Sequence, residues 1–189
     1  MDAQSIKRSL IFIVDDQQDS IQLLRDILEN AGYSRFRWTN DPRVALSLFL
    51  ECKPDLVILD LKMPHLDGFS VLRQLTARLS PSEYLPVIVL TADPSLESRQ
   101  KALASGARDF LSKPFDPTEV VLRVRNLLET RWLYLQLEEK SHHFEQLVQE
   151  RTKELEEAQE EILQRLAQVA EYRDDHVPPQ LEMEEAFSR

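Results

Sequence analysis

Five short apolar runs alternate with longer segments of helical period along the N-terminal part of the chain. These runs are residues 9–14, 35–38, 55–59, 86–90 and 109–111. Three of them are apolar throughout, which is typical of parallel strands that helices cover on both faces. The alternation of such strands with helices predicts βαβ units. We therefore expect an α/β fold with a doubly wound, five-stranded parallel sheet.

The pair Asp-Pro marks the expected start of three helices, at residues 41–42, 93–94 and 116–117. An Asp side chain there accepts hydrogen bonds from the free amides of the first turn, and Pro fits because it has no N–H to satisfy. Glu119 stands three residues after Asp116, where a capping box places its acid. The third pair is therefore expected to begin a well-capped helix.

A single long helix is predicted after this alternating part. Neither Gly nor Pro occurs between Pro117 and Pro178, and such a composition favours an uninterrupted helix. From Phe144 to Tyr172 the apolar positions recur mostly at intervals of three, four or seven residues, although the polar Arg151 occupies one of them. This spacing indicates a coiled coil with one stutter. A charge-rich single helix, or partial disorder, is the alternative.

Charge divides the chain near residue 130. Residues 1–130 carry 16 Lys and Arg against 18 Asp and Glu, whereas residues 131–189 carry 7 against 15. We expect a compact domain at residues 1–130, an extended helix that forms a homodimer at 131–176, and a disordered tail at 177–189. The acidic C-terminal part repels phosphate backbones and anionic lipids, so direct binding to nucleic acid or to a membrane is not expected.

Targeting signals and disulfides are not expected in this sequence. No charged-then-apolar leader opens the chain, and no apolar stretch has the length of a membrane span. Cys52 is the one cysteine, and its place in an apolar run predicts a small hydrophobic residue at the end of a helix. These features predict a soluble, cytoplasmic protein.

Candidate chemistry lies just after the apolar runs. The polar residues at these positions are Asp15, Asp16, Asp60, Thr91 and Lys113. Because the carboxyl ends of parallel strands meet at one edge of a sheet, these side chains are expected to converge there. Three carboxylates in one cleft repel one another and call for a hard cation with oxygen ligands, which Mg²⁺ fits. A carboxylate beside such an ion can act as a nucleophile toward a phosphoryl group.

Four segments resemble the receiver family of response regulators. They are VDD at 14–16, LDLKMPHLDG at 59–68, LTA at 90–92 and FLSKPF at 110–115. The resemblance implies a flavodoxin-like sheet with strand order 2-1-3-4-5. It also implies a Mg²⁺ cofactor and a sensor histidine kinase as the partner that supplies phosphate.

The resemblance assigns a role to each residue of the cleft. Asp60 matches the phosphate-accepting aspartate, Asp16 matches a Mg²⁺ ligand, and Asp15 helps to hold the ion mainly through water. Lys62 would offer its backbone carbonyl to the metal, and Thr91 matches the hydroxyl that binds the phosphate and acts in the switch.

Two residues near the last strand complete the resemblance. Lys113 matches the lysine that pairs with the phosphate, and its bond to Pro114 would be a cis peptide. Phe110 stands where the family places an aromatic residue that turns inward on activation. The predicted function is a receiver that accepts phosphate on its own aspartate and relays the signal through a dimerising helix.

The end of the long helix resembles a different domain. Residues 165–175, RLAQVAEYRDD, are similar to the opening of an HD-GYP output domain, a cyclic di-GMP phosphodiesterase. The metal-binding His-Asp and the Gly-Tyr-Pro of that family do not follow, and His176 precedes their expected place. The chain is therefore not expected to be an enzyme. Two alternatives remain: a fragment of a phosphodiesterase response regulator, and a phosphate sink without output.

Overall fold

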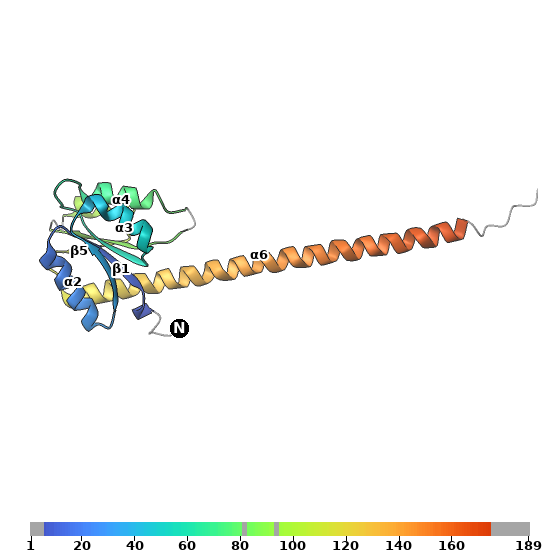
Figure 1. Cartoon of the computed structure of the whole chain (residues 1–189), viewed down its shortest axis with the longest axis horizontal. Coiled ribbons are helices and arrows are strands. Elements are labelled where there is room, and N and C mark those ends of the chain that lie inside the picture. Colours follow the sequence, from blue (N-terminus) through green and yellow to red (C-terminus); the bar gives the residue numbers. More distant parts are fainter. Residues whose placement is uncertain (1–5, 81–82, 93–94, 175–189) are drawn as a thin grey trace, which may run out of the picture. The chain divides into compact units, whose positions relative to one another are not determined.

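The computed structural model describes residues 6–80, 83–92 and 95–174. Five parallel strands form one sheet in the order β2-β1-β3-β4-β5 (Figure 1). The strands are β1 Leu10–Val14, β2 Arg35–Thr39, β3 Leu56–Asp60, β4 Val87–Thr91 and β5 Asp109–Ser112. The expected flavodoxin-like order and all five expected strands are confirmed.

Helices cover both faces of this sheet. They are α2 Gln18–Asn30, α3 Ala45–Cys52, α4 Gly68–Thr76, α5 Leu96–Ala104 and α6 Pro117–Asp174, with a short 3-10 helix, η1, at Pro42–Val44. One buried cluster joins the sheet to α2 and the first turns of α6, and a second joins it to α3, α4 and α5. The sheet is therefore doubly wound.

Strand β1 shows why the central runs are apolar throughout. Ile11 and Ile13 belong to the cluster under α2 and α6, whereas Phe12 and Val14 belong to the cluster on the other face. All four side chains are 0% exposed. Successive side chains of a strand point to opposite faces, so a strand covered on both sides needs an apolar residue at every position.

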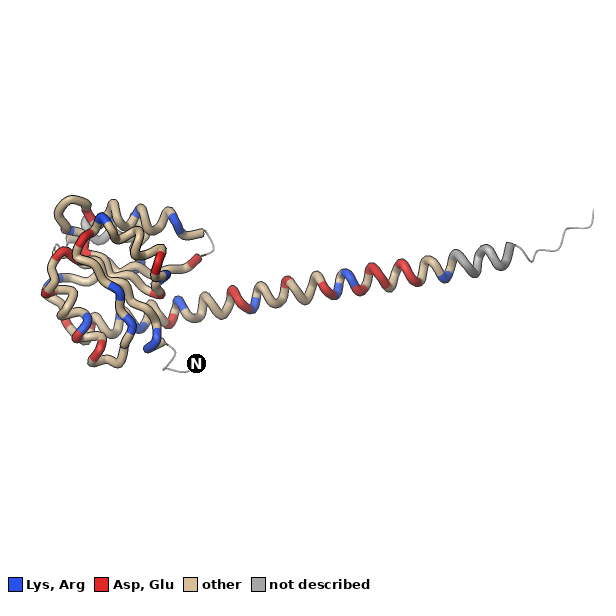
Figure 2. Tube along the Cα trace, in the orientation of Figure 1, with Lys and Arg blue, Asp and Glu red and all other residues tan. Residues whose placement is uncertain are grey.

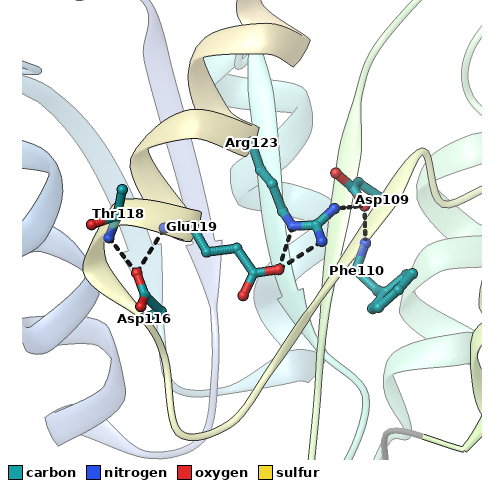
Figure 3. Close-up of polar contacts among 6 residues, drawn as sticks. All are labelled: Asp109, Phe110, Asp116, Thr118, Glu119 and Arg123. Atoms are coloured by element: carbon teal, nitrogen blue, oxygen red, sulfur yellow. Dashed lines mark hydrogen bonds and ion pairs between the residues drawn. The ribbon is translucent and has the colours of Figure 1, made fainter.

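At the start of α6, the side chain of Asp116 caps the free amides of the first turn. The Oδ1 atom of Asp116 accepts hydrogen bonds from the amides of Thr118 at 2.7 Å and Glu119 at 3.0 Å (Figure 3). The carboxylate of Glu119 does not reach back to Asp116; it accepts from the guanidinium of Arg123 at 2.6 Å instead. The expected capped start of α6 is therefore confirmed at Asp116, whereas the acid of Glu119 binds a charged partner one turn ahead.

The other two Asp-Pro pairs have different outcomes. The Oδ1 atom of Asp41 accepts from the amide of Arg43 at 2.9 Å, and the turn it caps is η1, so α3 begins only at Ala45. Residues 93–94 lie outside the described residues.

Contacts divide the chain into two compact units, Met1–Leu137 and Glu138–Arg189. Within the first unit, Arg131 of α6 donates a hydrogen bond to the carbonyl oxygen of Tyr84, and the ring of Tyr134 stacks on that of Tyr84 with centroids 5.3 Å apart. The packed unit thus reaches Leu137 rather than residue 130, while the functional domain limits stay a prediction. Residues 177–189, expected to be disordered, are outside the described part.

The described part of α6 is an uninterrupted helix to Asp174, as the absence of Gly and Pro predicted. In Figure 2 acidic and basic residues alternate with uncharged ones along its second half. Among the helices that the structure describes, none combines the length and apolar composition needed to cross a bilayer.

Candidate functional site

Three carboxylates meet at the carboxyl ends of β1 and β3. Asp15 and Asp16 directly follow β1, and Asp60 is the last residue of β3. One oxygen from each lies within 4.8 Å of the other two. Asp15 is 0% exposed and Asp60 is 3% exposed. The parallel sheet therefore brings together the three acids that the sequence predicted to converge.

The ammonium group of Lys113 bridges two of these acids. Its Nζ atom donates to Asp15 Oδ2 at 2.7 Å and to Asp60 Oδ2 at 2.6 Å. Burial raises the pKa of Asp15, and the hydrogen bond from Lys113 opposes that effect only in part. Burial lowers the pKa of Lys113, but its hydrogen bonds to the two acids outweigh burial and leave the pKa raised. Lys113 is therefore charged at neutral pH.

Backbone amides hold two of the acids in place. The Lys113–Pro114 peptide bond is cis, as the resemblance implied. The amide of Lys62 donates to Asp60 Oδ1 at 3.1 Å, so both carboxylate oxygens of Asp60 have donors. The amide of Gln17 donates to Asp15 Oδ1 at 2.9 Å. These contacts hold the carboxylates in one orientation; the expected role of the Lys62 carbonyl as a metal ligand stays a prediction.

Asp16 has a different environment. Its Oδ1 atom is buried and has no hydrogen-bond partner among the described residues. A buried carboxylate oxygen without a partner is costly unless it binds a cation. Three carboxylates against one ammonium also leave two excess negative charges in the cleft. The donor set therefore fits one divalent cation with oxygen ligands, such as Mg²⁺.

Thr91 lies beside the acids at the end of β4. Its residue is 4% exposed, and its carbonyl accepts from the amide of Lys113 at 2.9 Å. Strands β3 and β4 are neighbours in the sheet, so Thr91 and Asp60 end adjacent strands at the same edge. Thr91 is thus placed at the sheet edge that holds the cleft, and the role of its hydroxyl stays a prediction.

Phe110 lies on β5 beside a charged network that the sequence did not predict. The guanidinium of Arg123 lies 5.3 Å from the centre of the Phe110 ring, and it pairs with Asp109 at 2.6 Å and with Glu119 at 2.6 Å (Figure 3). The spacing of Glu119 and Arg123 is a helical i, i+4 pair and could have been found. The contact with Asp109 could not, because it joins a strand to a helix.

Gly68, the first residue of α4, lies against the backbone of Asp60 and Leu61 at the end of β3. A Cβ atom at this position would lie 2.1 Å from the carbonyl oxygen of Asp60 and 2.6 Å from Cα of Leu61. The amide of Gly68 donates to the carbonyl of Leu61 at 3.1 Å. Only glycine allows α4 to approach the end of β3 so closely.

Replacing Gly68 with Ala is therefore expected to lower the free energy of unfolding by about 2 kcal/mol or more, because the clash is with backbone atoms that have no rotamer to change. Denaturant unfolding measures the loss. Gln74→Ala is the matched control, since Gln74 is exposed on the same helix and should change stability by less than about 0.5 kcal/mol. Equal stability of both variants would show that the packing of α4 against the end of β3 does not require glycine at position 68.

Comparison with known proteins decides the family. Residues 11–125 match the family described as the response regulator receiver domain. The chain belongs to this family. The curated relatives of this receiver include the cyclic di-GMP phosphodiesterase response regulator RpfG of Xanthomonas campestris, 37% identical over 165 residues, and the response regulator MprA of Mycolicibacterium vanbaalenii, 43% identical over 118 residues. These matches cover 87% and 62% of this chain, but only 43% and 49% of the relatives.

Solved structures show the same fold. The receiver resembles the receiver domain of the Francisella response regulator 1452, with a TM-score of 0.59 and 31% identity over 65% of this chain and 98% of that one. NtrX from Brucella abortus matches with a TM-score of 0.63 and 30% identity over 70% of this chain and 29% of that one. The resemblance that the sequence motifs indicated is confirmed.

Proposed function

We propose that this receiver accepts a phosphoryl group on Asp60 from a sensor histidine kinase, with Mg²⁺ bound in the cleft. The observation that carries the proposal is the environment of Asp60. Its carboxylate is held by Lys113 and by the Lys62 amide, next to a buried oxygen of Asp16 that has no partner in the described part. This is a nucleophile beside a cation site and a fixed ammonium.

The cleft residues would bind the ion in different ways. Asp16 and Asp60 would be the carboxylate ligands, with the backbone carbonyl of Lys62 as a third protein ligand and Asp15 acting mainly through water. Bound Mg²⁺ supplies positive charge to the oxygens of the phosphoryl group during transfer. The cation would also relieve the repulsion among three carboxylates in a buried space.

Asp60 then carries out the transfer. A carboxylate oxygen of Asp60 forms a bond to phosphorus while the bond between phosphorus and the kinase histidine nitrogen breaks. The bonding electron pair stays on the imidazole nitrogen of the kinase. The product is an aspartyl phosphate on Asp60, and the chemistry needs no further reactant.

Lys113 and Thr91 would stabilise the transferred group. The ammonium of Lys113, now 2.6 Å from Asp60 Oδ2, would turn to a phosphoryl oxygen, and the Thr91 hydroxyl would donate to another. As Thr91 moves toward the phosphate, Phe110 would fill the space on the same side of the sheet. Thr91 and Phe110 are therefore the proposed switch.

The proposed output acts through protein contacts rather than nucleic acid. The net charge of −10 opposes contact with phosphate backbones. The described second half of α6 carries exposed apolar side chains, which supports a homodimer through residues 131–176. Residues 1–130 would then be the phosphate-accepting domain.

A second candidate function comes from the extent of one match. Similarity to RpfG covers 165 residues, against 118 for MprA, and so continues into the helical segment. This supports a role as the regulatory part of a cyclic di-GMP phosphodiesterase response regulator. Residues 1–189 carry neither the His-Asp nor the Gly-Tyr-Pro motif of such an enzyme, so we expect no hydrolysis of cyclic di-GMP by this chain itself. A hydrolysis assay with Mg²⁺ or Mn²⁺ measures this.

The test of the main proposal is phosphorylation of the full chain by acetyl phosphate in the presence of Mg²⁺. One phosphoryl group per chain should appear, labile to hydroxylamine as acyl phosphates are, on the peptide that contains Asp60. Removal of the metal by EDTA should stop the reaction. A phosphate sink would differ in the next step, because it would drain phosphate from the kinase faster than the kinase's other targets receive it.

The cation site has its own prediction. Asp16→Ala removes one charge from a crowded cleft, so the metal-free variant should be no less stable than the wild type. Mg²⁺ should raise the melting temperature of the wild type but not of the variant, because an ion that binds only the folded state stabilises it. Differential scanning calorimetry with and without Mg²⁺ measures both, and Asp19→Ala, an acid outside the cleft, is the control. Full Mg²⁺ stabilisation of Asp16→Ala would reject this ligand.

A further inference from the structure

A pocket of about 340 Å³ lies at the edge of the sheet opposite the acidic cleft. Its residues Lys53 and Pro54 come just before β3, and Leu85 comes just before β4, so it sits at the amino ends of these strands. The cleft lies at their carboxyl ends. None of the residues that surround this pocket belongs to the phosphate-accepting site.

The inner wall of the pocket is apolar. Phe49 and Leu85 are each 6% exposed, and Leu79 is partly buried beside them. Water in such a space makes few hydrogen bonds, so an apolar group that fills it gains free energy. The wall therefore favours the hydrocarbon part of a ligand.

The charges around the pocket are mostly positive and come from three different elements. Lys53 follows α3, Arg78 follows α4 and Arg131 lies on α6, while Glu83 is the one acid in the lining. In the described part of the chain, none of these three cations has a carboxylate within ion-pair distance. The pocket thus has a net positive lining.

One guanidinium nitrogen of Arg131 has no acceptor in the described part of the chain. Its Nε atom is buried and has no hydrogen-bond acceptor among the described residues, although another nitrogen of the same guanidinium donates to the carbonyl of Tyr84. A buried donor of a charged group without an acceptor is unfavourable. Because the Arg131 side chain also lines the pocket, an anionic group placed there would lie beside this cation.

We propose that this pocket binds a small organic anion, an apolar body that carries one carboxylate. The apolar body would lie against Phe49 and Leu85, and the carboxylate would face Lys53, Arg78 and Arg131. An inorganic anion would leave the apolar wall uncovered, and a neutral apolar molecule would leave the three cations without a negative partner. The ligand would join α6 to the segments that follow α3 and α4.

The test uses the full chain, with octanoate as the probe and 1-octanol and sulfate as comparisons. Backbone amide shifts in ¹H–¹⁵N spectra should saturate with octanoate and should be largest near Leu85 and Arg131. Octanol and sulfate should each shift the same amides much less at the same concentration. Equal shifts with octanol, or with sulfate, would overturn the proposal, as would the absence of saturable shifts.

Variants that keep the fold make the test specific. Lys53 ends α3 in the left-handed region, with φ of 45°, where glycine is the preferred residue. Lys53→Gly therefore removes the charge while relieving the backbone. This variant and Arg78→Gln should each weaken octanoate binding by about tenfold, the loss of one charged contact. Arg8→Gln, which removes an exposed charge outside the pocket, should bind as the wild type does. Unchanged binding by Lys53→Gly and Arg78→Gln would reject the assignment.

Discussion

A chain in which Asn replaces Asp60 is expected to take up no phosphoryl group from acetyl phosphate while keeping its fold. The amide of Asn has nearly the shape of the carboxylate, and its oxygen can still accept from the Lys62 amide, which donates to Asp60 Oδ1 at 3.1 Å. The amide is not a nucleophile toward phosphorus, so the transfer stops. Asp15 keeps its own contact with Lys113 at 2.7 Å, which leaves the ammonium paired.

Intact-mass spectrometry after incubation with acetyl phosphate and Mg²⁺ measures the uptake, and thermal unfolding checks the fold. Asp26→Asn is the matched control, since Asp26 is an exposed acid of α2 that accepts a hydrogen bond from Gln22 in the same helix and lies outside the cleft. This control should be labelled as fully as the wild type. Phosphate that persists on Asp60→Asn and is released by hydroxylamine would mean that another carboxylate is the acceptor.

The second prediction concerns the dimerisation of this chain through α6. The full chain is expected to be a dimer at micromolar concentration whether or not Asp60 is phosphorylated, and Leu155→Glu is expected to make it a monomer. The apolar positions of the helix remain exposed in the single chain: Phe144 68%, Val148 54%, Leu155 66%, Ile162 57% and Leu166 60%. A stripe of this length on one helix face is stabilised when a second helix covers it.

Local ion pairs do not explain such a helix by themselves. Among the side chains described from Phe144 onward, the ion pairs of Lys and Arg are Arg151–Glu154, Lys153–Glu157 and Arg165–Glu161. All join residues three or four apart on an exposed surface, and pairs of this kind stabilise a helix only weakly. The apolar stripe is therefore the stronger reason to expect a partner helix.

Sedimentation velocity on the full chain measures the mass. Gln149→Glu is the control for Leu155→Glu, because it adds the same charge one residue after Val148, off the stripe. The wild type, Asp60→Asn and Gln149→Glu should all sediment as dimers. A monomeric wild type would show that α6 is a solvated single helix beyond the first unit.

Parallel orientation is expected because it places like positions side by side, including Arg151 beside its own copy, where Glu154 at 2.7 Å offsets the repulsion. Ala158→Cys tests this. In a parallel dimer the two new thiols face each other and should form a disulfide on mild oxidation. Cys52, a partly buried thiol whose pKa burial raises, should not crosslink in the wild type. Failure of Ala158→Cys to crosslink within a proven dimer would favour antiparallel pairing.

Local sequence signals were sufficient for the architecture and for the identity of the cleft residues. The apolar runs predicted β1, β3 and β4 because a strand covered on both faces has to be apolar at each position. The runs at the edge strands β2 and β5 are shorter and partly exposed, and their alternation with helices predicted them. The position of Asp60 and Thr91 directly after buried runs predicted that they meet, because parallel strands end at a common edge. The absence of Gly and Pro between Pro117 and Pro178 predicted α6, which continues to Asp174 in the described residues.

Contacts between elements distant in the sequence were decided only by the tertiary structure. The pairing of Lys113 with phosphate stays a prediction, whereas its bridge between Asp15 and Asp60, 98 and 53 residues away, is seen only in the folded chain. The Gly68 backbone approach and the contact of Arg123 with Asp109 likewise join separate elements.

In α6, Arg131 and Tyr134 pack on Tyr84, which is also distant from them in the sequence. Periodicity along one chain records which face of an element is buried, but not which side chain of another element it meets. The sequence by itself therefore determined the strands, the helices and the acids at the sheet edge. The folded chain decided how Asp15 and Asp60 share one lysine, that Oδ1 of Asp16 is buried without a partner among the described residues, and where α6 stops packing on the receiver.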